Sequence, residues 1–474
     1  MSFISLLITH YQLSIVNSIF DDMQKNKLNI HLIAMGGSVM HALAIALKHQ
    51  GHSVTGSDDQ FFNPAKSALE KEQLLPATTG WNPEKISKGL DFVILGMHAQ
   101  KDNPELLKAQ EIGLPVYSFP EFIYQHSKNK QRIVVAGSHG KTTITSMLMH
   151  VLKYHNKTFD FVVGANVKGF DGRVQLSDAP VIVIEGDEYL SSRIDETPKM
   201  MRYQHHVGII NGIAWDHINV FKTENEYIDQ FKKFADATPK AGTLAYNTED
   251  ALAEKIGSEE RPDVVRLPYN ALPAKVKNGQ TFLETSNGEV PINVFGRHNL
   301  INMAAAKEVL ARLSITEDEF FEAISSFESP SLRLEKLVSR DGLTVYRDYA
   351  HAPSKVKATT QAVKEQSTGR KLVALLELHT YSSLNKSFLS HYSGALNGCD
   401  EAIVFFDPEA IALKKLDTIT KQDVITSFNS KGLKVINSVD VLEKELKSID
   451  ASNTDVLLMS SGNFGGLDLI SFFE

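Results

Sequence analysis

Short apolar runs alternate with amphipathic stretches along most of this 474-residue chain. The alternation starts at Leu28, where a strand-like run is followed by a segment of helical period, and it continues to the C-terminus. Such a pattern is typical of βαβ units and of mainly parallel sheets, so it predicts an α/β protein. Because one hydrophobic core rarely grows beyond about 250 residues, a chain of this length is expected to form several domains.

The predicted elements fall into three series. The first comprises strands at residues 29–35, 53–55, 92–95 and 115–117 and helices at 39–49 and 104–110. The second comprises strands at 132–136, 181–185, 207–210 and 243–246, a helix from 141 toward 154, an antiparallel flap at 264–294 and a helix at 300–313. The third comprises strands at 344–346, 371–376, 402–406 and 455–459.

Composition and charge exclude several classes of protein. Hydrophobic residues make up 42% and charged residues 22% of the chain, as in an ordinary globular enzyme. The formal net charge is −8, without a basic stripe, so no nucleic-acid partner is expected. Cys399 is the only cysteine, which excludes an internal disulfide framework and fits a reducing compartment, the cytoplasm. The opening residues lack the basic region and cleavage site of a signal peptide, and no membrane partner is expected.

A glycine-bearing loop follows the first strand of the second series and opens a helix. In this context backbone N–H groups and a helix N-terminus can bind phosphate, a lysine adds charge, and a hydroxyl can hold Mg²⁺. The loop departs from the full phosphate-loop pattern because Val135 stands where the first glycine is expected. The residues of this predicted triphosphate site are Gly137, Ser138, His139, Gly140, Lys141, Thr142 and Thr143.

Acidic residues cluster at the end of the next apolar strand, where an open parallel sheet binds its ligands. Glu185 is the predicted Mg²⁺ ligand, and Asp187 and Glu188 are expected to be acids of a solvated loop. His217 follows the strand at 207–210. Its position is consistent with either of two roles, a metal ligand or a structural histidine.

These observations predict three domains. Polar or proline-bearing stretches at 126–130 and 329–331 separate the series. We predict a Rossmann-like N-terminal domain at 28–128, a central P-loop ATPase-like parallel-sheet domain at 129–329 and a Rossmann-like C-terminal α/β domain at 330–474. We expect residues 1–27 to form an extension. It is either a disordered or loosely attached segment, or it is not native and the true start is Met23.

The first βα turn leaves a rival interpretation open. Asp58 lies 58 − 37 = 21 residues after Gly37, a spacing that also fits a dinucleotide site. An NAD-dependent dehydrogenase is therefore an alternative from another enzyme class, and a nucleotide-binding regulator without catalysis is a second.

Five motifs in this order resemble the Mur ligases of peptidoglycan assembly, from about Leu28 to the C-terminus. The resemblance implies an ATP-dependent, Mg²⁺-requiring amide ligase. Each motif is weak alone, but their shared order and separation are specific. They are residues 137–143 (GSHGKTT), 185–189 (EGDEY), 216–217 (DH), 296–299 (GRHN) and 348–353 (DYAHAP).

The resemblance implies a role for each matched residue. Lys141 would neutralise the β- and γ-phosphates, Thr142 and Glu185 would hold a first Mg²⁺, and His217 a second. His298 and Asn299 would bind the adenine, Asp348 the ribose and Arg333 the γ-phosphate, while His351 would lie at the cleft. The chain departs from the family's pattern at Leu332, where the first residue of an Arg-Arg-x-Glu run is usually arginine, and at Ala352, which replaces a second histidine.

The substrates follow from the same resemblance. Gly36, Gly37 and Ser38 would bind the pyrophosphate of UDP-N-acetylmuramate, with Ser57 and Asp58 toward the nucleoside. His379 and Asn463 would lie at the site of the incoming amine. The C-terminal run 459–466 is similar to members that attach the tripeptide L-alanyl-γ-D-glutamyl-meso-diaminopimelate in peptidoglycan recycling, and members that add L-alanine are the alternative. The sequence leaves the oligomeric state open.

Overall fold

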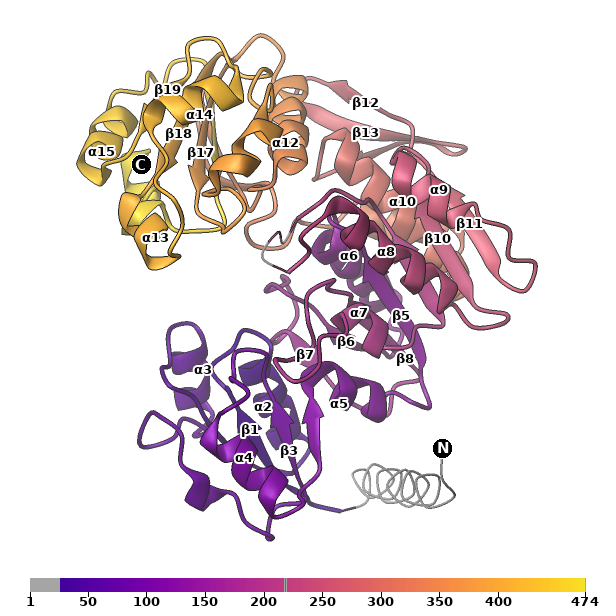
Figure 1. Ribbon diagram of the computed structural model, residues 1–474. Coiled ribbons are helices and arrows are strands. Elements are labelled where there is room, and N and C mark those ends of the chain that lie inside the picture. Colours follow the sequence, from indigo (N-terminus) through magenta and orange to yellow (C-terminus); the bar gives the residue numbers. More distant parts are fainter. Residues whose placement is uncertain (1–25, 217, 219, 474) are drawn as a thin grey trace.

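The computed structural model describes residues 26–216, 218 and 220–473 (Figure 1). Residues 1–25 of the predicted extension lie outside the described residues, and so does His217. The described strands form four sheets, of four, seven, three and six strands. Figure 1 shows them as an arc of lobes, in which the indigo N-terminal lobe and the yellow C-terminal lobe flank the magenta central part. The predicted α/β class is confirmed.

The N-terminal sheet is parallel, in the order β2-β1-β3-β4. It matches the first predicted series to within a few residues at each end. Its strands are β1 (Asn29–Ile33), β2 (Ser53–Ser57), β3 (Phe92–Leu95) and β4 (Val116–Ser118), and its helices are α2 (Met40–His49), α3 (Ala65–Lys71), α4 (Pro104–Glu111) and α5 (Phe119–His126), with a 3-10 turn η1 (Pro83–Lys85).

The central sheet has the order β11-β10-β9-β5-β8-β6-β7 and is parallel except for β7. Its strands are β5 (Gln131–Ala136), β6 (Asp160–Val162), β7 (Val174–Gln175), β8 (Val181–Glu185), β9 (Val207–Ile210), β10 (Thr243–Asn247) and β11 (Val265–Tyr269). Its helices are α6 (Lys141–Tyr154), α7 (Lys199–Arg202), α8 (Glu224–Asp236), α9 (Ala251–Gly257), α10 (Arg297–Ala311) and α11 (Glu317–Ile324).

The flap predicted at 264–294 is wrong in its first part. An antiparallel sheet does form there, from β12 (Ala274–Lys277), β13 (Gln280–Thr285) and β14 (Gly288–Ile292). The preceding run, β11, instead pairs in parallel with β10 at the edge of the central sheet. A short run with some alternation fits either pairing, and only the non-local partner decides between them.

The C-terminal sheet has the order β15-β16-β20-β17-β18-β19 and is parallel except for β15. Its strands are β15 (Glu335–Arg340), β16 (Leu343–Asp348), β17 (Lys371–Leu378), β18 (Glu401–Phe406), β19 (Lys434–Ile436) and β20 (Thr454–Met459). Its helices are α12 (Pro353–Gln366), α13 (Pro408–Leu413), α14 (Lys421–Phe428) and α15 (Val439–Lys447), with 3-10 turns η2 (Lys386–Tyr392), η3 (Phe464–Gly466) and η4 (Ile470–Phe472).

Strand register brings the chemistry-bearing loops of the central sheet together. Strand β5 pairs with both β8 and β9, so that Val135 lies beside Glu185 and Ala136 beside Ile210. The carboxyl ends of these strands therefore open at one edge, where an open parallel sheet binds ligands. Within the described part of the chain, no helix is both long and apolar enough to cross a membrane.

The core of the C-terminal sheet makes a direct stability prediction. Leu375 is fully buried on β17, between β18 and β20, whereas the Leu413 side chain is 83% exposed. We expect Leu375→Ala to lower the free energy of unfolding by about 2–5 kcal/mol, because it removes buried methyl groups and leaves a cavity. Leu413→Ala, the same chemical change at the surface, is expected to stay within about 0.5 kcal/mol. Urea denaturation followed by tryptophan fluorescence and circular dichroism measures both; equal effects would contradict this packing.

Candidate active site

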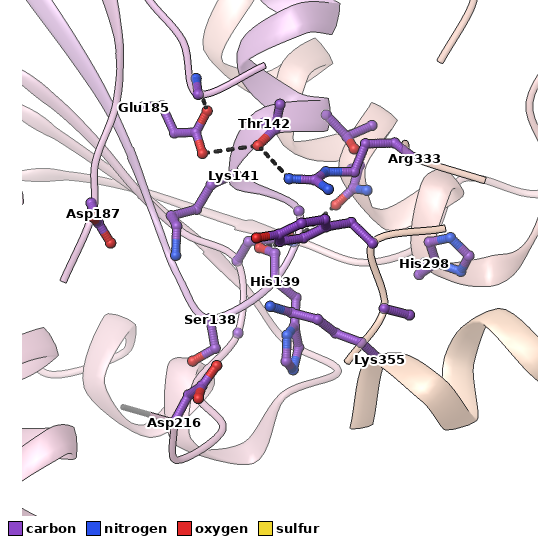
Figure 2. A pocket seen from close by; sticks show the side chains of 18 of the residues that line it. Ser138, His139, Lys141, Thr142, Glu185, Asp187, Asp216, His298, Arg333 and Lys355 are labelled. Carbon is purple, nitrogen blue, oxygen red and sulfur yellow. Dashed lines mark hydrogen bonds between the residues drawn. The ribbon is translucent and has the colours of Figure 1, made fainter. Parts of the chain in front are cut away.

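A cavity of 820 Å³ lies between the strand ends of the central sheet and the start of helix α12 (Figure 2). Its wall includes side chains from the central and the C-terminal parts of the chain, more than 150 residues apart in sequence. The predicted site residues that it brings together are Ser138, His139, Gly140, Lys141, Thr142, Thr143, Glu185, His298, Asn299, Arg333, Asp348, His351 and His379.

The glycine-bearing loop is held tightly against its neighbours. Gly140 is the residue before helix α6 and has a left-handed backbone, with φ 73°. A β-carbon at this position would lie 2.2 Å from Asn302 Oδ1 and 2.3 Å from Asn211 Nδ2, so only glycine fits. Val135, at the position of the absent first glycine, is instead a fully buried residue of strand β5. Gly137 lies just outside the cavity wall, with φ 131°.

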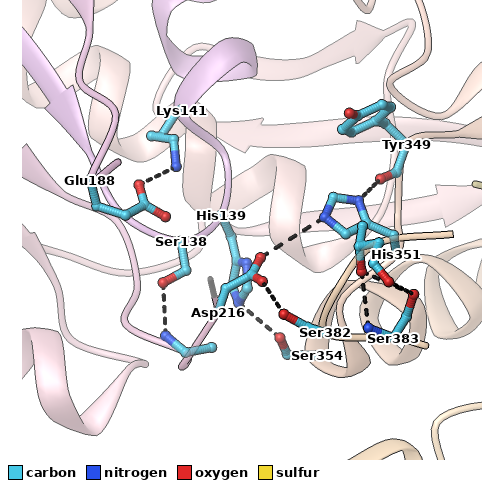
Figure 3. Close-up of polar contacts among 12 residues, drawn as sticks. Ser138, His139, Lys141, Glu188, Asp216, Tyr349, His351, Ser354, Ser382 and Ser383 are labelled. Atoms are coloured by element: carbon cyan, nitrogen blue, oxygen red, sulfur yellow. Dashed lines mark hydrogen bonds and ion pairs between the residues drawn. The ribbon is translucent and has the colours of Figure 1, made fainter. Parts of the chain in front are cut away.

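Lys141 is the first residue of α6, and its ammonium is paired inside the protein (Figure 3). It donates to Glu188 Oε2 at 2.6 Å and to the carbonyl of Gly137 at 2.8 Å. Burial lowers the pKa of Lys141, but the carboxylates of Glu188 and Asp187 outweigh it, so the pKa lies above its ordinary value.

The prediction that Glu188 belongs to a solvated loop is wrong. The residue is 1% exposed, and its second oxygen accepts a hydrogen bond from the Tyr227 hydroxyl at 2.9 Å. Tyr227 also bonds to Ser138 Oγ at 2.7 Å, which links the acid to the glycine-bearing loop. The prediction failed because residues distant in sequence bury Glu188, and no local pattern reveals such burial. Asp187 is half-buried and pairs with Lys199 at 2.8 Å.

Thr142 and Glu185 place two oxygen groups side by side (Figure 2). The Thr142 hydroxyl donates to Glu185 Oε1 at 2.9 Å and lies 3.2 Å from Arg333 Nη2, which donates to it. The other carboxylate oxygen accepts the N–H of Gly164 at 2.7 Å. No described group of three or more His, Cys, Asp or Glu side chains could hold a metal by itself. Mg²⁺ needs no such cage, because it retains waters and is shared with phosphates.

Arg333 reaches this site from a strained segment. Its neighbours Leu332 and Leu334 have φ of 60° and 49°, in the left-handed region that costs non-glycine residues about 1–2 kcal/mol each. The guanidinium lies over the ring of Tyr349, 4.7 Å from its centroid. Strain of this kind persists where the surroundings require a particular geometry, and here that geometry aims Arg333 across the cavity.

Asp348 is the last residue of strand β16, and His351 follows it at the cavity. Asp348 is buried and accepts the N–H of Ala350 at 2.7 Å. Burial raises its pKa to about 6, although the nearby Arg333 opposes the change. The His351 ring has Nδ1 at 2.7 Å from the carbonyl of Tyr349 and Nε2 at 3.9 Å from Asp216 Oδ2 (Figure 3).

His298 and Asn299 lie in the first turn of helix α10. Burial lowers the pKa of His298 to about 4, and its buried Nδ1 has no hydrogen-bond partner among the described residues. Helix α10 begins at Arg297, three residues before the predicted start at 300, with Gly296 before it. The Asn299 amide donates to the carbonyl of Phe295 at 2.9 Å.

The residues predicted for the nucleotide sugar form a separate group in the N-terminal lobe. Asp58 accepts the N–H of Gly36 at 2.7 Å, and burial, followed by the neighbouring Asp59, raises its pKa to about 6. Ser38 contacts Arg173 of the central part of the chain. All five residues of this group lie outside the wall of the 820 Å³ cavity: Gly36, Gly37, Ser38, Ser57 and Asp58.

The two residues predicted for the amine are divided. His379 lines the cavity, with Nδ1 3.8 Å from Glu377 Oε1, whereas Asn463 is exposed and lies outside it. The buried Glu377 organises the loop after strand β20, since it accepts from Ser460 Oγ and from the N–H of Phe464 at 2.9 Å.

Sequence reasoning missed several residues of the cavity wall. Asp216 is buried and accepts from Ser382 Oγ at 3.5 Å, and the His139 ring lies 3.0 Å from Ser354 Oγ (Figure 3). These contacts join the central and C-terminal lobes. The only available signal for Lys355 was its position two residues after a matched motif. Ser461 lies in the matched run 459–466, and Lys414 carried no signal. The residues of the wall to which the sequence assigned no role at the site are Glu188 and Asp216, which belong to matched motifs, and Lys355, Lys414 and Ser461.

Comparison with known proteins identifies the family to which this chain is similar. The sequence matches three profiles: "Mur ligase family, catalytic domain" at residues 29–131, "Mur ligase middle domain" at 135–310 and "Mur ligase, glutamate ligase domain" at 332–462. The chain is 32% identical to a UDP-N-acetylmuramate–L-alanine ligase of Caldicellulosiruptor saccharolyticus, over 85% of this chain and 88% of the relative.

Two further relatives have similar extent. The UDP-N-acetylmuramate–L-alanyl-γ-D-glutamyl-meso-2,6-diaminoheptandioate ligase of Haemophilus influenzae is 26% identical, over 93% of this chain and 97% of the relative. The crystal structure of a UDP-N-acetylmuramate-alanine ligase from Thermotoga maritima matches with a TM-score of 0.69 at 22% identity. The match covers 94% of this chain and 97% of that one. The chain therefore belongs to the Mur ligase family, ATP-dependent ligases that form C–N bonds.

Proposed function

We propose that this enzyme joins the lactyl carboxylate of UDP-N-acetylmuramate to the α-amine of L-alanyl-γ-D-glutamyl-meso-diaminopimelate, with conversion of ATP to ADP and phosphate. The observation that supports it best is the meeting of Lys141, the Thr142–Glu185 pair and Arg333 in one cavity. Cationic and oxygen groups so arranged suit a triphosphate with a divalent ion.

We assign each part of ATP to a group of cavity residues. The α6 N-terminus, the loop 137–143 and Lys141 would bind the phosphates. Asp348 would accept the ribose hydroxyls, and the unpartnered Nδ1 of His298, with Asn299, would face the adenine. Mg²⁺ would be held by Thr142 and Glu185, and a second ion by His217, and these ions would supply charge neutralisation at the phosphates.

The chain's own residues position two successive reactions. In the first, the muramate carboxylate oxygen takes the γ-phosphoryl group of ATP, and the bond to the ADP oxygen breaks. In the second, the amine forms the C–N bond, phosphate leaves with the C–O electrons, and one proton is released from the amine. Lys141 and Arg333 would orient the phosphoryl group from opposite lobes, and His351, beside Asp216, would take the proton.

We propose the same division of labour for the predicted domains. Residues 28–128 would bind the UDP part through Gly36, Gly37, Ser38, Ser57 and Asp58; residues 129–329 would bind ATP; and residues 330–474 would bind the amine. The UDP group can lie outside the 820 Å³ cavity because it is at the far end of the substrate from the carboxylate that reacts. Since ATP and nucleotide sugars are cytoplasmic metabolites, we place the reaction in the cytoplasm.

The amine site supports a peptide but leaves a second candidate. His379, Ser461 and the cation Lys414 line the cavity on the C-terminal side, and Asn463 lies on the adjoining loop. Lys414 suits the additional carboxylates of a tripeptide. L-alanine is the second candidate substrate, because the relative with 32% identity is named an L-alanine ligase.

A substrate panel tests the function. Purified protein with MgATP and UDP-N-acetylmuramate should release phosphate with the tripeptide at a kcat/KM at least about tenfold above that with L-alanine, the size of one well-formed polar contact. Lys141→Ala should lose on the order of 10³-fold in kcat, while Lys232→Ala, on the exposed face of α8, should match the unmodified enzyme. Turnover with L-alanine alone would establish the second candidate, and phosphate release with neither amine would refute both.

Glu185 makes a prediction about Mg²⁺. Glu185→Gln keeps the shape of the side chain but removes the negative charge that faces the ion, so half-maximal activity should require roughly 10- to 100-fold more Mg²⁺. Glu328→Gln, at a residue whose side chain is 52% exposed, is the matched control and should leave the Mg²⁺ curve in place. Superimposable curves for both variants would exclude Glu185 as a ligand.

Asp348 makes a prediction about pH. Burial raises its pKa from 3.8 to about 6, so the folded protein retains a proton there that the unfolded chain loses first. The contribution of this group to stability is therefore fully present below pH 4 and is lost as the pH rises to about 6. The Tm of Asp348→Asn, minus that of the unmodified protein, should increase between pH 4 and 6 and then level off. A constant difference across this range in thermal scans would contradict the raised pKa.

A further inference from the structure

Lys355 carries a charge at the cavity that the preceding assignments do not use. It is the third residue of helix α12, half-buried, and lines the cavity beside His139 (Figure 2). The charged groups that act on it are Asp216, Lys141, Glu188 and Arg333. Two of these, Lys141 and Arg333, are the cations proposed above for the triphosphate.

The surroundings of Lys355 do not compensate its charge. Among the residues that the structure describes, its ammonium makes no hydrogen bond and no ion pair, whereas Lys141 has Glu188 and Arg333 has Thr142. A cation in the first turn also faces the positive end of the helix dipole. Burial lowers the pKa of Lys355 and Asp216 only partly offsets it, so the charged form would gain from a further anion.

The sequence departs from the matched family run at Leu332. The Arg-Arg-x-Glu run that the resemblance implies has two arginines, and Leu332 stands in place of the first. Arg333 alone then remains of the pair. Lys355 lies on the same side of the cavity and is a neighbour of Arg333.

We propose that Lys355 binds the γ-phosphate of ATP from the C-terminal lobe and stays with the phosphoryl group during its transfer, in place of the missing arginine. The inference rests on the proposed use of ATP in this cavity. An ammonium suits this role because it offers a compact charge and three donors to phosphate oxygens. An ammonium without a direct partner at the N-terminal end of a helix carries a cost, which binding of the phosphate would offset.

Nucleotide binding tests the proposal without the acceptor or the amine. Calorimetry with Mg²⁺ would compare a β,γ-methylene analogue of ATP with ADP. Lys355→Met should weaken the triphosphate analogue roughly 10- to 100-fold and ADP by less than about threefold, because only the analogue carries the γ-group. Lys357→Met, at an exposed lysine two residues along α12, is the matched control and should bind both nucleotides normally. Equal weakening of both nucleotides, or of neither, would overturn the assignment.

Stability separates this role from a structural one. Because Lys355→Met removes an uncompensated charge, its Tm should equal or exceed that of the unmodified protein. A lower Tm together with weaker binding would mean that Lys355 supports the fold instead. If the unmodified protein binds neither nucleotide, the proposed function fails, independently of Lys355.

Rescue tests the link to Leu332. Leu332 already has φ 60°, so Leu332→Arg adds a guanidinium without a new left-handed residue. In the Lys355→Met background, Leu332→Arg should raise both the affinity for the triphosphate analogue and the kcat for ADP release by at least about tenfold. The single variant Lys355→Arg should retain part of both. Failure of both arginine variants to restore the preference for triphosphate would reject the replacement.

Discussion

The buried ion pair between Lys141 and Glu188 holds the glycine-bearing loop in place at the cavity. Glu188 is bonded to Tyr227, and Tyr227 to Ser138, so the acid ties the lysine back to the loop from which helix α6 starts. Removing one partner of such a pair typically costs about 3–5 kcal/mol. The ammonium is therefore held at the start of helix α6, where the proposed phosphate site lies, and in that proposal a phosphate would join the ion pair without breaking it.

Local patterns were enough to predict most of the fold. Strands such as β8 and helices such as α6 have the predicted bounds because β-branched runs, helical period and a glycine turn are properties of neighbouring residues. The short strands β6, β7 and β19 and the edge strand β15 were not predicted, and β11 shows why local patterns are limited. Its residues alternate weakly, and pairing with β10 across helix α9 depends on contacts that no local window contains.

The same limit divides the candidate site. Residues at strand ends, such as Glu185, could be predicted because parallel strands finish at a common edge. Glu188, three residues on, was assigned to solvent, since its burial depends on Tyr227 from helix α8. Lys355 was overlooked for a similar reason: a lysine in a first helical turn is usually exposed, and only the approach of the central lobe turns it toward a cavity.

Two lobes contribute the cations, and this division couples charge to domain geometry. Lys141 belongs to the central lobe, whereas Arg333 and Lys355 belong to the C-terminal lobe. The polar contacts across the boundary include His139 with Ser354 at 3.0 Å and a long contact of 3.5 Å between Ser382 and Asp216. A triphosphate bound by all these cations, as proposed, would add to these contacts in holding the lobes together. Under the proposed function, the phosphate site would then be complete only when the two lobes lie side by side.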